Sequence, residues 1–247
     1  MMSNNTYKYH FAELRRRMLY VVIFFLFSCL VSYIWKQEIC CILIKPLEQI
    51  TLGVTKFIYT SIAEGFFSYL NLAVFCALIL TIPVLSYQLY RFIVPGLYYE
   101  ELRIARIVFI LAPLLFALAI LLVYFAVMPT VWKFFLSFDS IGIKPLIFEA
   151  RISQYLSIVI NLMLAFGIAF ELPVVLIILF LLKIISLQSM IKKRRISIVF
   201  NFILAGIITP PDVISQLMLA IPMCGLYEIT ILICKNIEKR SINCDRY

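Results

Sequence analysis

The fold of this chain is decided by the stretch HFAELRRR-MLYVVIFFLFSCLVSYI, in which residues 10–17 carry charges and residues 18–34 are almost wholly apolar. An apolar run of this kind approaches the ~20 residues with which an α-helix crosses the ~30 Å hydrocarbon core of a bilayer. The arginines before it favour the cytoplasmic side of a membrane. Glu13 has two interpretations. It pairs with Arg16 or Arg17 one turn on, or it is held at the membrane surface to bind a cationic ligand.

Composition extends this conclusion to the whole chain. The sequence is 64% hydrophobic and only 14% charged, with a mean hydropathy of +1.04, which lies outside the range of soluble globular proteins. We predict an all-α integral membrane protein with one multi-pass domain, residues 1–247. The first apolar run has no small-residue cleavage pattern, so it is expected to be a retained span rather than a signal peptide. The predicted spans are residues 18–34, 66–89, 104–128, 156–182, 196–208 and 213–233.

The positive charges agree with six spans. Six crossings place both termini on one side, and that side then holds all but six of the 22 Lys and Arg residues. The exceptions are Lys36, Lys45, Lys56, Lys133, Lys144 and Arg151. Because loops rich in Lys and Arg stay on the cytoplasmic side, both termini are predicted on the cytoplasmic or matrix side. The net charge of +9 therefore reflects topology, and no nucleic-acid partner is expected.

The last two of the six helices are predicted to be short. At 1.5 Å rise per residue, residues 196–208 cover only about 20 Å, and the turn at Pro210 and Pro211 follows. The last segment soon meets Pro222 and Glu228. Such a hairpin is too thin for a bilayer, so the lipid beside it should thin or the helices should gain partners. The alternative is a re-entrant hairpin that never crosses.

The sequence carries no signature of an enzyme. It has no HExxH, GxSxG or P-loop motif and no pair of aspartates within a span. Its one histidine, His10, lies outside the predicted spans. The seven cysteines are odd in number and form no CxxC pair, which argues against a disulfide framework or a metal site. We therefore predict no catalytic residue, no cofactor and no metal.

Three carboxylates, Glu171, Asp212 and Glu101, lie at positions that call for a structural or functional explanation. Glu171 falls inside the fourth predicted span, where an unpaired carboxylate costs several kcal/mol. Three interpretations are open. The carboxylate coordinates a transported ion, it forms a hydrogen bond with another membrane helix, or it lies near enough to the helix end to reach the membrane interface. Asp212 follows two prolines and is expected to cap the last helix. Glu101 lies on the same side as Glu13. The two either clamp a pair of guanidinium groups, or Glu101 and Glu100 belong to a solvated turn.

Five stretches in order along the chain resemble the TatC family, the multi-pass subunit of the twin-arginine protein translocase. They are HFAELRRR at 10–17, FIVPGLY at 92–98 followed by Glu101, AFGIAFELP at 165–173, TPPDVISQ at 209–216, and AIPM at 220–223 followed by Tyr227-Glu228. The resemblance implies six helices with both ends on the cytoplasmic-type face. It also implies that folded cargo crosses the membrane and that the proton-motive force drives transport.

The resemblance further implies site residues. Glu13 and Glu101 would recognise the Arg-Arg pair of a signal peptide. The remaining residues that the resemblance assigns to this binding surface are Arg15, Arg17, Pro46, Phe92 and Tyr98. Glu171 and Asp212 would contact single-span partner helices of the TatA and TatB type. Position 100 is Glu and position 102 is Leu, where relatives often differ, so which carboxylate faces the signal peptide stays open.

The function predicted from these residues is a signal-peptide receptor and assembly core for the export of folded proteins. It would work as a homo-oligomer within a receptor complex, surrounded by membrane lipid. The alternative is a proton-coupled small-solute transporter that uses Glu171. The abundance of Ile, Phe, Tyr and Lys suggests an AT-rich genome. That composition favours a mitochondrial inner membrane over a bacterial inner membrane or a thylakoid.

Overall fold

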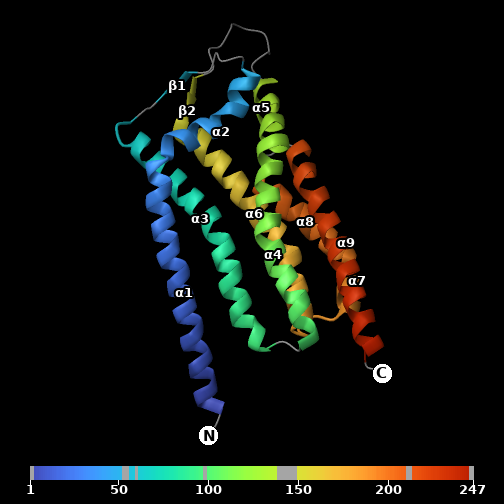
Figure 1. Ribbon diagram of the computed structural model, residues 1–247. Helices are drawn as coiled ribbons and strands as arrows, with labels where there is room; N and C mark the ends of the chain where they lie inside the picture. Colours follow the sequence, from blue (N-terminus) through green and yellow to red (C-terminus); the bar gives the residue numbers. More distant parts are fainter. Residues whose placement is uncertain are drawn as a thin grey trace.

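The computed structural model describes residues 3–51, 56–58, 61–96, 99–137, 149–209 and 213–244. These residues form long helices packed side by side, with a small cap at one end (Figure 1). The helices are α1 (Ser3–Ile34), α2 (Lys36–Ile50), α3 (Glu64–Ile93), α4 (Tyr99–Leu122), α5 (Met128–Ser137), α6 (Ile152–Leu181), α7 (Leu187–Lys192), α8 (Arg194–Ile208) and α9 (Val213–Cys244). A 3-10 turn, η1 (Val94–Gly96), follows α3, and a π-helical turn, η2 (Val123–Val127), joins α4 to α5.

The all-α membrane architecture predicted from the sequence is confirmed. Among the described residues, five helical segments are long and apolar enough to cross a membrane, namely Phe11–Ile34, Glu64–Gly96, Leu102–Ser137, Ile152–Leu181 and Val213–Glu238. The fifth predicted span is α8, which is short as expected: its 15 residues rise about 22 Å. Both ends of the chain lie at the same end of the bundle (Figure 1), as an even number of crossings requires.

The prediction of a short sixth helix is wrong. Helix α9 has 32 residues and continues through Pro222 and Glu228. A proline inside a helix removes one hydrogen bond and does not have to end the helix when neighbouring segments pack on both sides of it. Glu228 does not end it either, because its Oε2 lies 3.2 Å from Nη2 of Arg194 on α8. A charge that the sequence suggested as a stop is thus paired within the hairpin.

The third span also runs further than predicted and passes Pro129. Helix α5 carries it on to Ser137 after the π turn. A proline crowds the carbonyl four residues back and cannot donate to it. The π turn changes the hydrogen-bond register just before this position, and the Met128 N–H donates to the Val123 carbonyl. The helix therefore passes the proline with a local widening instead of a break.

The segment between the first two predicted spans, for which the sequence predicted no helix, forms much of the cap. It contains α2 and the short strand β1 (Lys56–Ile58), which pairs in parallel with β2 (Glu149–Arg151). This pairing joins the two outer connections to each other. Figure 1 shows α2 and the two strands at the end opposite the chain termini.

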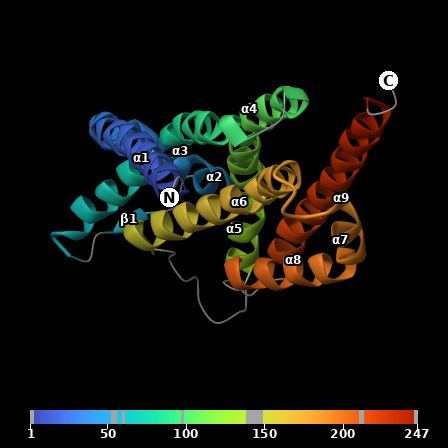
Figure 2. The same ribbon diagram turned by 90° about the horizontal axis from the view of Figure 1, so that it is seen from below.

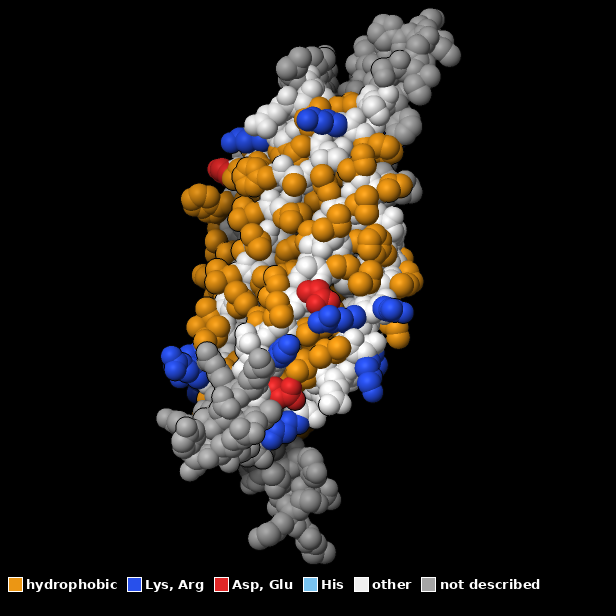
Figure 3. Space-filling model, turned by 90° about the vertical axis from the view of Figure 1, so that its right-hand side faces the viewer, with side chains coloured by type: hydrophobic (Ala, Val, Ile, Leu, Met, Phe, Trp, Pro, Cys, Tyr) orange, Lys and Arg blue, Asp and Glu red, His pale blue; other side chains and the backbone are white. Residues whose placement is uncertain are grey.

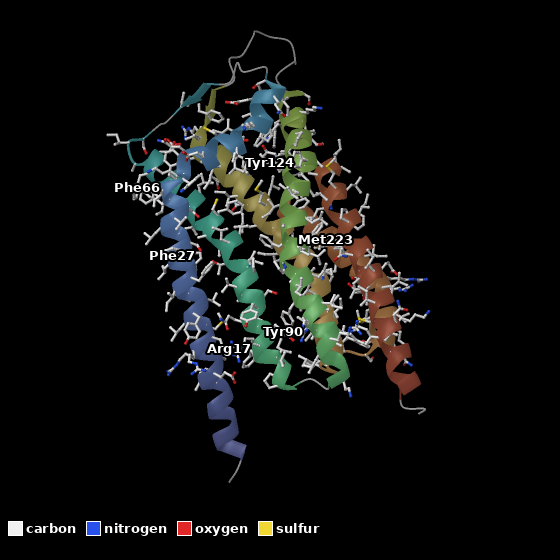
Figure 4. The ribbon with its side chains drawn as sticks, viewed as in Figure 1. Arg17, Phe27, Phe66, Tyr90, Tyr124 and Met223 are labelled. Carbon is white, nitrogen blue, oxygen red and sulfur yellow. The ribbon has the colours of Figure 1, made fainter. Side chains whose placement is uncertain are left out.

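Helix α6 is the centre of the core. It contributes Leu156, Met163 and Phe166, which are almost completely buried. Seen from below, α6 runs between α1 and α9, which lie on opposite sides of the molecule (Figure 2). On the face shown in Figure 3, apolar side chains cover the middle of the surface, and Lys and Arg gather more toward the end that holds the termini. Phe27 of α1 is 63% exposed and points away from the bundle (Figure 4), as a lipid-facing residue should.

Candidate functional site

Glu13 lies on α1 at the end of the bundle that holds the termini. Nε of Arg17 donates to Glu13 Oε1 at 3.1 Å, and Nη2 of the same arginine donates to the same oxygen. Of the two pairings expected from the sequence, Arg17 therefore makes the intrahelical ion pair. The Arg17 side chain is 14% exposed and that of Glu13 33% exposed. The pair thus holds a partly open carboxylate in one orientation at the membrane surface.

A hollow of about 550 Å³ lies beside this carboxylate. Arg15 and Arg16 line it together with Ala12, Glu13 and Leu19. Arg15 and Arg16 are exposed, whereas Arg17 turns toward α3. The hollow is a shallow surface feature of α1 alone, and it combines one acid, two exposed bases and the exposed apolar side chains of Ala12 and Leu19. These groups suit a peptide that carries both charged and apolar residues.

The α3–α4 connection reaches the same end of the bundle. Helix α1 packs against α3, and the turn between α3 and α4 lies at the end where α1 begins (Figure 1). Phe92 is half-buried in the last turn of α3. Glu101 belongs to the first turn of α4, but its side chain is outside the described residues, as is the whole of Tyr98. The backbone therefore brings Glu101 and Phe92 to the side of the membrane that carries Glu13.

Pro46 is not brought together with these residues. It lies inside α2, in the cap at the opposite end of the bundle, and it is buried. It therefore does not contribute to the hollow beside Glu13. The Cys40 side chain of the same helix is also buried. Burial raises the pKa of Cys40 to about 11, which keeps it neutral and a poor metal ligand.

Glu171 is half-buried on α6, in the same turn as Pro173. Its Oε1 atom is buried and has no hydrogen-bond partner among the residues that the structure describes. Pro173 has no N–H to offer the Ala169 carbonyl, so this part of α6 presents unusually polar backbone. Asp212, the second residue expected to contact partner helices, is outside the described residues.

A cavity of about 160 Å³ opens between α6, α8 and α9. Its walls are mostly apolar, but Ser197, Asn201 and Tyr227 also line it. Asn201 is only 4% exposed and donates to the Cys224 sulfur at 3.7 Å. The sequence contains a signal for this residue, because Asn201 is an amide inside the apolar run 196–208. Within the described parts of the chain, no three His, Cys, Asp or Glu residues gather as metal ligands would.

Comparison with known proteins identifies the family. Residues 9–222 match the family model of the Sec-independent protein translocase protein (TatC). The chain belongs to the TatC family. It is 44% identical over 241 residues to the Sec-independent protein translocase protein TatC of Rickettsia prowazekii, covering 96% of both chains. It is 33% identical over 233 residues to the uncharacterized tatC-like protein ymf16 of Reclinomonas americana, covering 93% of this chain and 87% of that one.

The fold agrees with solved TatC structures. A crystal structure of the twin arginine translocase receptor TatC superposes with a TM-score of 0.74 and 34% identity, covering 92% of this chain and 98% of the other. A second TatC structure, crystallised in DDM, gives a TM-score of 0.77 with 33% identity over 91% of this chain and 98% of that one. The resemblance seen in the five sequence stretches is therefore confirmed. The chain is a multi-pass membrane component of Sec-independent protein transport.

Proposed function

We propose that this TatC-family chain is the receptor that recognises twin-arginine signal peptides, and that it acts as one domain over residues 1–247. The observation that carries this proposal is Glu13, a partly open carboxylate held by Arg17 beside a hollow at the membrane surface. A guanidinium group binds a carboxylate through two parallel hydrogen bonds. An arginine of the signal peptide can therefore share the Glu13 carboxylate with Arg17 or replace it.

The proposed surface has a second carboxylate on the neighbouring connection. Glu101 would bind the other arginine of the pair, with Phe92 and Tyr98 contacting the apolar part of the peptide. Arg15 lines the hollow beside Glu13 and would repel peptides whose positive charges do not reach a carboxylate. We assign Pro46 no contact with the arginine pair, because it is buried at the other end of the bundle.

The experiment that tests this function compares two peptides on the detergent-solubilised chain. One carries Arg-Arg and the other Lys-Lys, which keeps the charge but loses the planar fork of donors. We expect the Arg-Arg peptide to bind at least about tenfold more tightly, since a bidentate charge-assisted contact is replaced by a point charge. Equal binding of both peptides would reduce the acids to a general charge patch. If neither bound, the receptor proposal would fail for the chain alone.

We further propose that Glu171 contacts a single-span partner helix of the TatA or TatB type within a receptor complex that contains several copies of this chain. Helices in a bilayer associate through hydrogen bonds between polar groups. A carboxylate whose Oε1 lacks a partner among the described residues is suited to such a contact. Family membership supports this translocase role over the small-solute transporter.

Glu171→Leu is expected to stabilise the isolated chain and to stop transport. Removing a carboxylate from the membrane interior relieves a cost of several kcal/mol, so the midpoint of thermal unfolding should rise. Export of a folded reporter in cells that supply the partner subunits should fall to background, because the partner helix loses its hydrogen bond. Glu171→Gln, which keeps two hydrogen-bonding atoms, should retain part of the export. A lower unfolding midpoint for Glu171→Leu would show that the carboxylate has a stabilising partner within the chain.

The membrane in which the chain works is also part of the proposal. The abundance of Ile, Phe, Tyr and Lys favours an AT-rich genome and a mitochondrial inner membrane. The relatives named above come from Rickettsia prowazekii and from Reclinomonas americana. Mitochondrial and bacterial inner membranes both carry a proton-motive force, which we propose drives the movement of folded cargo.

A further inference from the structure

The carbonyl of Ile42 in α2 lacks its usual helical donor and is bound by another segment. In an α-helix each carbonyl accepts from the N–H four residues on, but that position is Pro46. The Tyr124 hydroxyl, from the π turn of the third span, donates to the Ile42 oxygen at 3.0 Å. The next carbonyl is bound as well, because the Tyr155 hydroxyl donates to the Leu43 oxygen at 2.6 Å. Two spans therefore hold α2 through consecutive carbonyls.

The same arrangement occurs at the other end of the bundle. Pro113 lies inside α4 and cannot donate to the carbonyl of Phe109, four residues back. The Ser86 hydroxyl of α3 donates to that oxygen at 2.5 Å. Both residues are only 6% exposed. The Phe109 ring also packs edge-on against Tyr90, with 5.6 Å between ring centroids. α3 and α4 are thus joined a few residues before and after the connection that holds residues 92–101.

The two cases follow one rule. In each, the acceptor is the residue four positions before a proline, and the donor is a hydroxyl from a different helical segment. At Phe109, which is only 6% exposed, a carbonyl without a donor is costly, since nothing in a bilayer replaces the lost bond. At Ile42, which lies in the cap and is 50% exposed, the Tyr124 hydroxyl takes the place of the missing N–H. The proline leaves the carbonyl without its helical donor, and the hydroxyl supplies a replacement hydrogen bond. Loss of the hydroxyl should therefore lower the stability of the chain only while the proline is present.

We propose that Pro46 and Pro113 serve to release these carbonyls, and that Tyr124 and Ser86 are positioning residues that act through them. Tyr124 holds the α2 cap against the third span. Ser86 holds α3 against α4 near the end of α3 that carries Phe92 and the first turn of α4 that carries Glu101. The consequence of Ser86 for peptide recognition rests on the function proposed above, whereas the two hydrogen bonds do not.

Two double-mutant cycles on the detergent-solubilised full chain test this proposal. Tyr124→Phe removes only the hydroxyl and is expected to lower the midpoint of thermal unfolding by about 2–4 °C. In the Pro46→Ala chain, the restored N–H can bind the Ile42 carbonyl, so the same change should leave the midpoint unaltered. Ser86→Ala, with and without Pro113→Ala, forms the second cycle with the same expectation. Tyr20→Phe, at a side chain 54% exposed on α1, is the matched control and should change nothing.

Peptide binding supplies a readout that general destabilisation does not explain. Ser86→Ala is expected to weaken binding of the Arg-Arg peptide severalfold at a temperature where the chain is fully folded. Ser86→Ala with Pro113→Ala should bind as tightly as Pro113→Ala alone. If both unfolding cycles behave as expected while Ser86→Ala leaves peptide affinity unchanged, the link to recognition is overturned and the hydrogen bonds stand. If the native chain binds no Arg-Arg peptide, the proposed receptor function fails, and the unfolding cycles still decide the bonds.

Two further results would overturn the role of the prolines. One is an equal loss of stability with and without the proline, because the hydroxyl would then act in another way. The other is no loss at all in the native background. Alanine at either proline completes the hydrogen bonding of the helix, so both variants are expected to fold. Should one not fold, Pro46→Ser or Pro113→Ser, which also carries an N–H, replaces it. If neither the alanine nor the serine variant folds at one of the two prolines, the proposal is contradicted at that proline.

Discussion

Glu13→Lys is expected to lower the affinity for an Arg-Arg signal peptide by about a hundredfold or more. Removing one partner of a hydrogen-bonded charge pair costs about 2–5 kcal/mol, and each 1.4 kcal/mol is a factor of ten. The substitution also sets a lysine one turn from Arg17, where like charges repel. Titration of the detergent-solubilised chain with a labelled peptide measures the effect. The ionic strength must be fixed, because salt screens charges at a surface.

Glu38 offers a matched control for this charge reversal. It is an exposed glutamate on α2, at the opposite end of the bundle. Glu38→Lys changes the net charge by the same amount and should leave the affinity within about twofold of the native value. If it weakened binding as much as Glu13→Lys, net charge and not a local site would attract the peptide. Native affinity in Glu13→Lys would remove Glu13 from the recognition surface altogether.

Gly167→Ala is expected to cost about 2–3 kcal/mol in the free energy of unfolding, in spite of the higher helix propensity of alanine. A Cβ at this buried position of α6 would lie 2.9 Å from Cδ2 of Phe116 and closer still to Cε2 and Cζ of the same ring. Phe116, on α4, is only 4% exposed, so its ring has little room to move. Overpacking of this kind costs 1–3 kcal/mol or more. Thermal unfolding should show a midpoint about 4–10 °C lower.

The chain provides its own control for this prediction in Gly225. This glycine lies inside α9, and a Cβ built on it meets no atom within 4 Å. Gly225→Ala should therefore be neutral or stabilise the chain by up to about 1 kcal/mol, because alanine restricts the unfolded backbone and favours a helix. If the two alanine variants unfolded at the same temperature, close contact between α4 and α6 would not be what Gly167 provides.

The long spans and the position of Glu13 could be predicted because they depend on local patterns. Apolar length alone marks the first span, and the arginines before it mark its side of the membrane. Glu13 and Arg17 are one turn apart, so their pairing follows from helix geometry. Arg16, which the sequence left as an alternative, is instead exposed beside the hollow. The choice between the two arginines depends on α3, which no local pattern contains.

The errors arose where tertiary contacts override a local signal. Pro129 and Glu228 both suggest the end of a helix, yet the π turn carries the chain past the first, and Arg194 pairs with the second. Helix α2 was not predicted, because its apolar residues are interspersed with charges and do not reach the length of a span. Two tyrosines distant in sequence bind its carbonyls, and a partner so distant leaves no trace in the local pattern.

The short fifth helix has an electrical consequence. The voltage across an energised membrane falls over its low-dielectric layer. If the apolar layer matches the roughly 22 Å rise of α8 instead of ~30 Å, the field beside this helix is about a third stronger than in the surrounding bilayer. The dielectric barrier to a charged or polar group is lower there as well, because the path through hydrocarbon is shorter. The membrane next to α8 is thus where its electrical insulation is expected to be weakest, whereas α9, with 32 residues, is long enough to cross a bilayer of full thickness.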